Sequence, residues 1–581
     1  MTMQIANPLS LRWPRLRTGL PAFIMAIMLL VFSVLVIYPA ILILLTTFMV
    51  QPEVFVGPRQ WGLRNWATAF QEPRVLRALW NTFLVWGMTM AISMPISVVI
   101  AWTLARTRVP FSRALEFLFW LAYITPGGVI AWILLLDPQI GILNILLREI
   151  FSGLTEGPFN IFSLGGIVWV HLMGNGIALK VMLLTPAFRN MDVTLEEAAR
   201  VSGSSSVRTM VKVTLPLMAA PITLVFALQL VKIFQSFETE LLLGTPWGFY
   251  VYSTLIYDLV RNMEPPLYGE TAVLASLTVL VIAFVIPFQR WILSRKKYTT
   301  ITGAFKGGLL DLGAWKWVVF AVLALLHFML TIIQLASLIL GSFMTRSGYF
   351  QLKPTFTLSH WEFVFNDSLF LTALKTTLTL ATTTAIISPV LFAVIAYILV
   401  RTRWPGRGLL DTIIWSSAAI PGMLAGLGLL MLFLGTPGLN ILYGTIWAML
   451  IVVILQGKVT GINILKGNLV QIGSDMEEAA RISGAGWTRT FFRIWIPLLM
   501  PTLVLLGTMN FVIAATTTAS IILLASRGTI TLSILVLQYA SPIHGQREAA
   551  SAVSVIIAAL ALGLSFLARR FESKVSVLPR D

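Results

Sequence analysis

Long segments without any charged side chain constrain this sequence more than any other feature. A transmembrane helix needs about 20 consecutive apolar residues to cross the hydrocarbon layer of a bilayer. The segments that meet this need are 18–52, 78–105, 117–136, 157–179, 213–231, 271–289, 317–345, 376–400, 412–457, 494–526 and 549–568. The segment 412–457 is long enough for two helices, and the turn residues Gly435-Thr436-Pro437-Gly438 interrupt it. The chain is therefore predicted to be an all-α polytopic membrane protein with about twelve transmembrane helices.

The composition excludes several other classes of protein. Charged residues make up 11% of the chain, whereas soluble domains average about 25%. The absence of cysteine excludes a disulfide scaffold and a cysteine-based metal site. A net charge of +17 could suggest nucleic acid, but a nucleic-acid binder needs its cations clustered on a water-exposed face. This chain has little such face, so no nucleic-acid partner is predicted and membrane lipid is the expected surrounding.

Basic residues gather in alternate loops, as the positive-inside rule describes for cytoplasmic loops. With the N-terminus in the cytoplasm, the same side receives Arg106, Arg108 and Arg113, the 186–216 loop, the 289–316 stretch, the 466–497 loop and the C-terminal tail. Both termini are therefore predicted to be cytoplasmic. The positive charge is interpreted as a topology signal.

Three short motifs occur twice in the same order along the chain. LARTRVP (104–110) recurs as LVRTRWP (399–405), Pro126-Gly127 as Pro421-Gly422, and EEAAR (196–200) as EEAAR (477–481). The first two recur after 295 residues and the third after 281, so each half holds six spans in the same order. An even number of spans gives both copies the same orientation in the membrane, which makes this a parallel repeat. The predicted units are residues 1–300, with most of the basic linker, and residues 301–581.

A polar, helix-forming loop follows the fourth span of each half, at residues 195–217 and 476–498. Glu196 with Arg200, and Glu477 with Arg481, are predicted ion pairs with the favourable acid-first order. The alanines between them leave a smooth helical face for another protein. Gly203 and Gly484 are predicted to end the first short helix, and a second helix leads to the next span. Each loop is thus predicted to be a short helix–turn–helix at the membrane surface.

The spacing Glu-Ala-Ala, three residues, Gly, nine residues, Ile-x-Leu-Pro resembles the EAA loop of permease subunits of bacterial ABC importers. The first copy consists of Glu197-Ala198-Ala199, Gly203, Val213 and Leu215-Pro216, and the second of Glu478-Ala479-Ala480, Gly484, Ile494 and Ile496-Pro497. The departures, Val213 for Ile and Ile496 for Leu, are conservative. The resemblance covers nearly the whole chain and implies a fused permease with the type I ABC importer fold.

In that family each loop docks on an ATPase subunit, whose ATP-driven closure rocks the permease halves. The resemblance therefore implies that the following residues contact ATPases: Glu196, Glu197, Ala198, Ala199, Arg200, Gly203, Glu477, Glu478, Ala479, Ala480, Arg481 and Gly484. No G-x-x-x-x-G-K-[ST] phosphate loop occurs in the chain, so ATP and magnesium are expected on two separate ATPase subunits. The chain itself is expected to be no enzyme, with no catalytic residue, no cofactor and no metal site.

Fusion of both halves resembles the importers of ferric iron, thiamine and aminoethylphosphonate. This resemblance implies a bacterial inner membrane, a periplasmic binding protein as partner, and a small polar solute as cargo. Ferric iron is the first candidate, and thiamine or a phosphonate come next.

Four ionisable residues are candidates for the substrate pathway, because such groups within a membrane are functional by default. Lys180 and Lys458 precede the two loops and are expected either to line an anion-friendly path or to snorkel to an interface and pair with neighbours. Glu238 and Glu240 follow the fifth span on the outer side. They are expected either to guide a cation or touch the binding protein, or to lie in a solvated outer loop.

Two other functional classes remain open at this stage. A secondary transporter driven by an ion gradient would also have twelve spans and a repeat, but it has no use for paired docking loops. A membrane scaffold without transport would explain the loops only if they bind something other than an ATPase.

Overall fold

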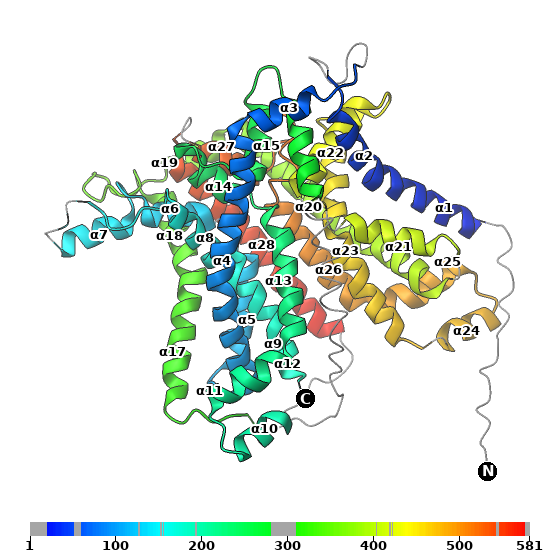
Figure 1. Ribbon diagram of the computed structural model, residues 1–581, viewed down its shortest axis with the longest axis horizontal. Helices are drawn as coiled ribbons and strands as arrows, with labels where there is room; N and C mark the ends of the chain where they lie inside the picture. The colour runs from blue at the N-terminus through cyan, green and yellow to red at the C-terminus, as the bar shows by residue number, and fades with distance from the viewer. Residues whose placement is uncertain are drawn as a thin grey trace.

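The computed structural model describes residues 20–50, 60–125, 128–151, 154, 156–191, 194–280, 309–402, 404–417, 420, 422–473, 475–541 and 545–575. These residues form helices joined by short loops. Isolated β-bridges are the only β-type pairing within the described part. The helices gather in two groups, each built mainly from one half of the sequence and joined by the first helices of the other half (Figure 1). Most of the basic linker between the halves, residues 289–308, and both chain ends lie outside the described residues.

Each predicted span of the first half contains a helix. In order these are α1–η1–α2 (Leu20–Phe32, Ser33–Ile37, Tyr38–Thr46), α4 (Pro73–Arg106), α5 and α6 (Ser112–Ile124, Gly128–Leu136), α8–η2–α9 (Leu164–His171, Leu172–Gly176, Ile177–Arg189), α13 (Ala219–Ile233) and the helix Tyr268–Leu280.

The second half repeats this order. Its helices are α17–η5–α18 (Trp315–His327, Phe328–Ile332, Ile333–Phe343), α20 (Ser368–Arg401), α21 and α22 (Arg407–Ser416, Gly422–Gly435), α23 (Ile446–Gln471), α25–η8–α26 (Trp487–Thr490, Phe491–Trp495, Ile496–Thr516) and α28 (Arg547–Val575). The turn predicted at residues 435–438 separates α22 from α23.

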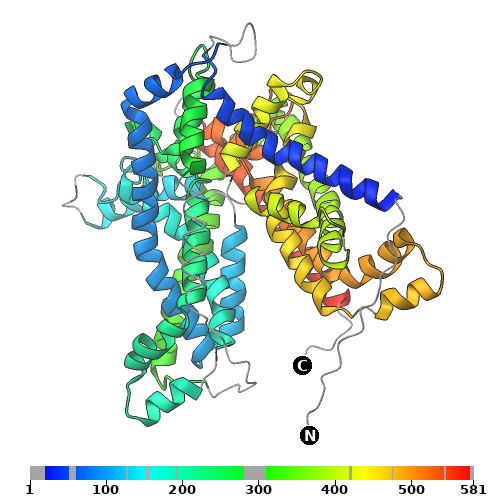
Figure 2. The same ribbon diagram turned by 45° about the vertical axis from the view of Figure 1, so that its right-hand side comes forward.

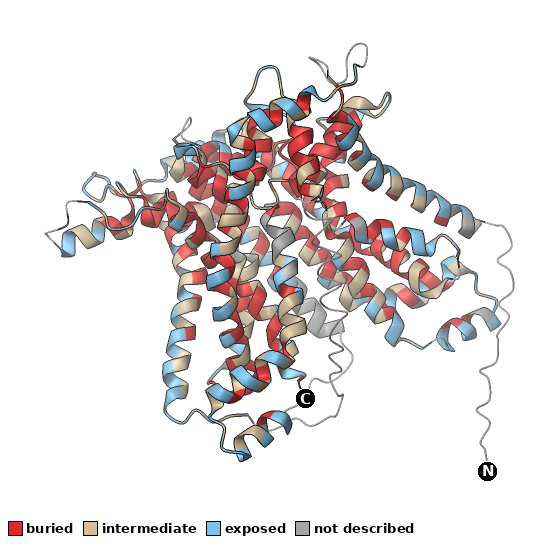
Figure 3. Cartoon of the chain, in the orientation of Figure 1, coloured by how far each residue is buried: buried red, intermediate tan, exposed pale blue. Residues whose placement is uncertain are grey.

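By length and composition, seven helices of the described part can cross a membrane, and nine can if each of two bent pairs counts as one span. The helices of the other predicted spans are shorter. Each half begins with a long helix carrying exposed apolar side chains, among them Phe23, Leu30, Val322 and Leu325, along its outer face (Figure 3). Apolar side chains that face outward along a whole helix are suited to lipid. The predicted fold class, an all-α polytopic membrane protein with two parallel repeats, is confirmed.

The third span of each half is broken where the sequence repeats a Pro-Gly pair. Helix α5 ends at Ile124 and α6 begins at Gly128, with a bend of 92° between them. Likewise, α21 ends at Ser416 and α22 begins at Gly422. Proline lacks the backbone donor that a continuous helix needs, so a break at this place follows from the sequence. Pro126-Gly127 and Pro421 themselves lie outside the described residues.

The first span of each half packs against the other half. Helices α1 and α2 contact α21 and α22 of the second half, and α17 and α18 contact α5 and α6 of the first half. The crossing is visible in Figure 2, where the N-terminal helix lies beside the second half. The two halves are therefore interlocked by an exchange of equivalent helices.

The halves meet at one end of the molecule and diverge toward the other (Figures 1 and 2). The divergent end carries the predicted loops, and we call it the docking end. At the opposite end lie α3 (Arg64–Gln71), α15 (Tyr252–Arg261), α19 (Ser359–Asn366) and α27 (Leu532–Ala540). We call this the clamp end, because ionic and apolar contacts join the halves there.

Two arginines make polar contacts between the halves at the clamp end. Arg261 of the first half donates from Nη2 to the backbone carbonyl oxygens of Ile522, Leu523 and Ala525 in the second half, at 3.0, 3.1 and 2.9 Å. Arg547 of the second half pairs with Asp137 of the first half at 2.7 Å. Guanidinium groups suit this task because they present several donors in a fixed plane.

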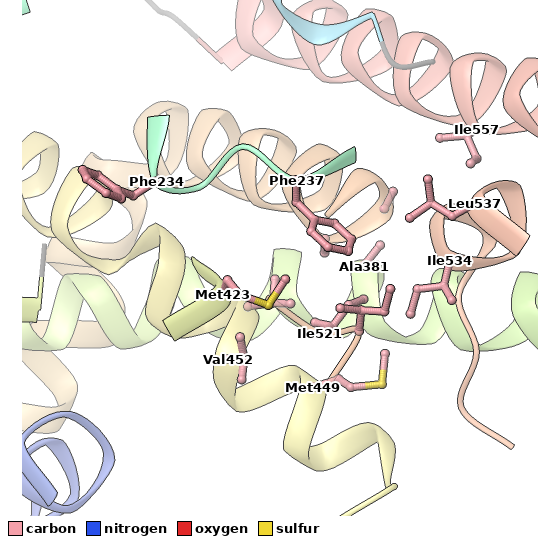
Figure 4. Close-up of a cluster of buried hydrophobic side chains, with 14 of the residues drawn as sticks. Phe234, Phe237, Ala381, Met423, Met449, Val452, Ile521, Ile534, Leu537 and Ile557 are labelled. Carbon is pink, nitrogen blue, oxygen red and sulfur yellow. The ribbon is translucent and has the colours of Figure 1, made fainter. Parts of the chain in front are cut away.

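An apolar contact accompanies these two arginines. Phe237, in the segment after α13 of the first half, points toward Ala381 and Ile521 of the second half (Figure 4). Met423 and Leu537, also of the second half, belong to the same buried cluster. Burial of an aromatic side chain between the halves adds a hydrophobic term to the ionic contacts.

Candidate functional site

A short helix, a turn and a second helical segment form at both predicted loops. The first helices are α10 (Thr194–Val201) and α24 (Asp475–Ile482), which we call the docking helices. Helix α11 (Ser206–Thr209) follows α10, and α25 follows α24. Each second segment then continues through a π-helical turn, η3 (Met210–Thr214) or η8, before the next span. The predicted helix–turn–helix is present in both halves.

Both docking helices end at the predicted glycines. Gly203 and Gly484 have φ angles of +83° and +75°, in the left-handed region where side chains are strained. The amide of Ser204 donates to the carbonyl oxygen of Ala199 at 3.0 Å, and the amide of Ala485 donates to that of Ala480 at 2.9 Å. This bond across six residues marks a Schellman cap, which satisfies carbonyl groups that the helix leaves free.

The first glutamate of each docking helix turns inward. Glu196 is buried, accepts a hydrogen bond from the Thr214 hydroxyl at 2.6 Å, and lies 3.8 Å from Nε of Arg106. Glu477 is also buried and accepts a hydrogen bond from the Tyr397 hydroxyl at 2.8 Å. The predicted pairing of Glu196 with Arg200 on the helix surface is wrong, because the carboxylate faces the protein interior instead. The side chain of Arg481 lies outside the described residues, so the predicted pair with Glu477 stays a prediction.

Exposed apolar side chains occupy equivalent positions on the two docking helices. Val201 and Ile482 are 89% and 88% exposed, and they lie 281 residues apart. Leu195 and Met476 are also exposed and are separated by the same offset. At 3.6 residues per turn, positions six apart lie about 120° apart around the helix, so the two exposed side chains of each docking helix point to different sides. Large apolar residues exposed at matching places in both halves indicate a surface that another protein covers.

The remaining predicted docking residues divide between two environments. Glu197, Ala198, Glu478 and Ala479 are exposed, as are both glycines, whereas Ala199 and Arg200 are half-buried and Ala480 is buried. The exposed residues of this group can contact a partner protein directly. The inward set, with Glu196 and Glu477, holds each docking helix to its own half.

Replacing both turn glycines by valine is expected to abolish uptake while the protein still inserts into the membrane. A Cβ at Gly203 or Gly484 meets no atom of this chain within 4 Å, so the cost comes from the left-handed backbone. That cost is about 1 to 2 kcal/mol at each site for a side-chain-bearing residue. Asparagine tolerates the left-handed region, so the paired Gly→Asn variant is expected to retain most of the uptake. Normal uptake by the valine variant, measured at equal membrane abundance, would contradict the assignment of these turns.

A cavity of about 1760 Å³ lies between the halves. Both halves supply polar side chains to its wall, including His171, Lys180, Gln334, Gln456, Lys458 and Asn510. Side chains of α4, such as Thr89 and Met90, line it as well. A cavity of this size accepts a small hydrated solute or a metal chelate.

Lys180 and Lys458 are both buried in the protein and both line this cavity. The Lys180 ammonium donates to the carbonyl oxygen of Gly176 at 2.6 Å, and the Lys458 ammonium donates to that of Leu455 at 2.7 Å. They come from α9 and α23, the fourth spans of the two halves. The structure thus brings two cations to one cavity from opposite halves.

Glu238 and Glu240 are not in a solvated outer loop. Glu240 is 1% exposed, and its carboxylate pairs with Nε2 of His171 at 2.7 Å and accepts from the Ser236 hydroxyl at 2.6 Å. Burial, the largest influence, would raise the pKa of Glu240, but the interactions with His171, the hydrogen bond from Ser236 and a backbone hydrogen bond together outweigh burial and lower the pKa. Glu238 lines the cavity and accepts a hydrogen bond from Thr518 of the second half. These acids belong to the contact between the halves near the clamp end.

Sequence reasoning did not find the partners of the docking helices. Arg106 and Arg401, the last residues of α4 and α20, contact the loops that precede α10 and α24 through the carbonyl groups of Met191 and Ile472. Both arginines recur in LARTRVP and LVRTRWP, a pattern that indicates the internal repeat and the topology but does not by itself show a contact with the docking loops. The inward glutamates could have been anticipated only from the tertiary structure.

Two interlocked helical halves, a cavity between them and a docking surface on each half define a membrane transport subunit that works with other proteins. A sequence profile described as "Binding-protein-dependent transport system inner membrane component" matches residues 390–577. A ferric transport system permease protein of Actinobacillus pleuropneumoniae is 24% identical over 370 residues, covering 61% of this chain. The alignment spans 52%, about half, of that relative's length.

A molybdate/tungstate transport system permease protein of Pyrococcus abyssi is 30% identical over 204 residues, covering 35% of this chain and 79% of that protein. Among solved structures, a bacterial ABC transporter involved in alginate import aligns with a TM-score of 0.40 and 19% identity, covering 47% of this chain and 95% of that one. The chain belongs to the family of binding-protein-dependent transport system inner membrane components, the permease subunits of ABC importers.

Proposed function

We propose that the chain is a fused pair of permease halves of an ATP-driven importer, which moves a small polar solute from periplasm to cytoplasm by alternating access. The observation that supports this most is the pair of equivalent docking helices at one end of the molecule, each with an exposed apolar side chain at the same place. Two such surfaces suit two copies of one ATPase subunit. This assembly puts the docking end on the cytoplasmic side of the inner membrane, the side that the positive-inside rule predicts for both chain termini.

The clamp end would then face the periplasm and receive a substrate-loaded binding protein. Neither Arg261 nor Arg547 lines the cavity, and both join the halves at the clamp end, so entry of cargo from that end would require those contacts to break. Closure of two ATPases would draw the docking helices together and force this change. Binding energy at one end is thereby converted to opening at the other.

Ferric iron is the first candidate cargo, supported by the ferric transport relative. The two buried lysines of the cavity fit an anionic species better than a bare cation, so iron would cross as a complex with anionic ligands. Thiamine or a phosphonate are the next candidates. The ligand that copurifies with the partner binding protein discriminates among them.

Uptake into proteoliposomes separates this proposal from a gradient-driven transporter. The chain is purified with an ATPase subunit that assembles with it, and labelled solute is presented with the binding protein. The proposal predicts uptake that requires ATP hydrolysis and survives dissipation of ion gradients by an ionophore. Uptake that persists without ATP and is abolished by the ionophore would support the secondary transporter instead.

Replacing Lys180 or Lys458 by methionine is expected to lower uptake about tenfold at unchanged protein abundance, because a buried charge facing a cavity acts on whatever crosses it. Lys→Arg variants keep the charge and are expected to lose less. The measurement is the rate of uptake divided by the amount of protein in the membrane. If abundance and uptake fall equally, the lysines serve packing and the pathway assignment fails.

A further inference from the structure

The long second helix of each half ends at an arginine. Helices α4 and α20 each contain 34 residues and end at Arg106 and Arg401, which are 295 positions apart. At 1.5 Å per residue each helix is about 50 Å long, enough to run from one end of its half to the other. In Figure 1, α4 descends from α3 toward the docking end. A side chain at the final residue therefore reaches the region of the docking helix.

Both arginines bind the same place in the chain just before the docking helix. Arg106 donates from Nη2 to the carbonyl oxygen of Met191, and Arg401 donates from Nη2 to those of Ile472 and Leu469, the latter at 2.7 Å. Met191 and Ile472 lie 281 positions apart, which is the offset of the docking helices and not that of the arginines. The arginine and the segment before the docking helix recur at different offsets, 295 and 281, yet the contact between them is present in both halves.

A second connection joins each of these helices to the first glutamate of the docking helix. In the first half Arg106 itself approaches the carboxylate of Glu196. In the second half the hydroxyl of Tyr397, one turn before Arg401 on α20, donates to Glu477.

The difference between the halves has a simple origin in the sequence. Thr214, which donates to Glu196, corresponds to Trp495, and the indole of Trp495 lies 4.9 Å from the guanidinium carbon of Arg401. Tyr397 in turn corresponds to Trp102. In the first half the hydroxyl donor is on η3 and the corresponding aromatic residue is on α4. In the second half the hydroxyl donor is on α20 and the corresponding aromatic residue is on η8. The connection to the buried glutamate is retained in both.

These contacts are rigid enough to transmit a displacement. Arg106, Glu196 and Glu477 are each less than 10% exposed, so water does not compete strongly for their hydrogen bonds. An arginine stays charged and offers a planar fork of donors, so two carbonyl groups can be held in one geometry. Helix α4 lines the cavity through Thr89 and Met90, while α20 packs on α23 and α26, which line it. A push on the first docking helix therefore reaches the cavity through Arg106 and α4, and a push on the second reaches it through Arg401, α20 and the two helices packed on α20.

We propose that Arg106 and Arg401 are positioning residues that couple the docking helices to the cavity-forming spans. This inference rests on the proposed function, since it assigns the route by which ATPase closure moves each half. It predicts that loss of the arginines separates ATP hydrolysis from transport, whereas loss of an ordinary structural contact would reduce both together.

The test compares the double variant Arg106→Gln/Arg401→Gln with Arg108→Gln, a matched loss of an exposed arginine in the same loop. Each complex is purified with its ATPase and binding protein and reconstituted. For the double variant we expect normal ATPase copurification, basal hydrolysis within about twofold of the unmodified complex, and at least about a tenfold fall in solute moved per ATP, since a charge-assisted contact is lost in each half. The variant Arg106→Lys/Arg401→Lys, which keeps the charge but not the fork, should fall between the two.

An unchanged amount of solute moved per ATP in the double variant would overturn the coupling role. Failure of the ATPase to copurify with the double variant would also overturn it, because the arginines would then only support the docking surface. Measurements on the unmodified complex distinguish failure of the proposed function from failure of the coupling inference. If it shows no ATP-dependent uptake, the proposed function fails; if it transports and the double variant transports with equal yield, only the coupling inference fails.

Discussion

Replacing Val201 and Ile482 by aspartate is expected to separate the chain from its ATPase subunits and to lower uptake at least about 100-fold. Both side chains are almost fully exposed, so the substitutions cost the isolated chain little. In the assembled complex each carboxylate would be buried against a partner without a counter-ion. A penalty of about 3 kcal/mol, typical of disrupting the centre of an interface, corresponds to about a 100-fold loss of affinity.

The matched control is Ile441→Asp. Ile441 is 76% exposed but lies between α22 and α23, where the turn belongs to neither docking loop. This variant is expected to copurify with the ATPase as the unmodified chain does. If the double variant at positions 201 and 482 still brings down stoichiometric ATPase and supports uptake, the docking surface has been placed on the wrong face.

Replacing Arg261 and Arg547 by alanine is expected to raise ATP hydrolysis in the absence of binding protein at least about fivefold. Together these arginines make three bonds to carbonyl groups and one ion pair across the clamp end. Charge-assisted bonds contribute about 1.5 to 3 kcal/mol each, and none of them joins the halves once that end has opened. Their loss therefore shifts the population toward the open clamp end, which is coupled to ATPase closure.

Arg148→Ala provides the comparison for this second variant. Arg148 also donates to a backbone carbonyl oxygen, that of Gln139, but both residues belong to the first half. Its loss is expected to leave basal hydrolysis unchanged. Unaltered hydrolysis in the Arg261/Arg547 double variant, with normal assembly, would show that the clamp end is not held by these contacts.

The sequence predicted the helices well because bilayer physics acts on each span separately. A charge-free segment of sufficient length, such as 78–105 or 376–400, can only be a helix if it crosses hydrocarbon. The turn at Gly203 and Gly484 was predictable for the same local reason, since only glycine enters the left-handed region freely. The Pro-Gly breaks of the third spans also correspond to features that were visible in the sequence.

The parts that could not be predicted depend on contacts between distant segments. Glu196 has a favourable local partner four residues on, yet its carboxylate is turned by Arg106 and Thr214. Glu238 and Glu240 follow a span and resemble a solvated loop in sequence, but the second half and His171 enclose them. Periodicity reports which face of a helix is apolar, and it carries no information about which helix covers that face.

The central claim is that two equivalent surfaces on one chain recruit two ATPase subunits, and the mass of the intact complex tests it most directly. The chain is coexpressed with its ATPase subunit, released in mild detergent and measured by native mass spectrometry. The account predicts a complex of one permease chain and two ATPase subunits, reduced to one ATPase when only Val201 or only Ile482 is replaced by aspartate. A transport-competent chain that carries no ATPase, or that carries one and is insensitive to both substitutions, would contradict it.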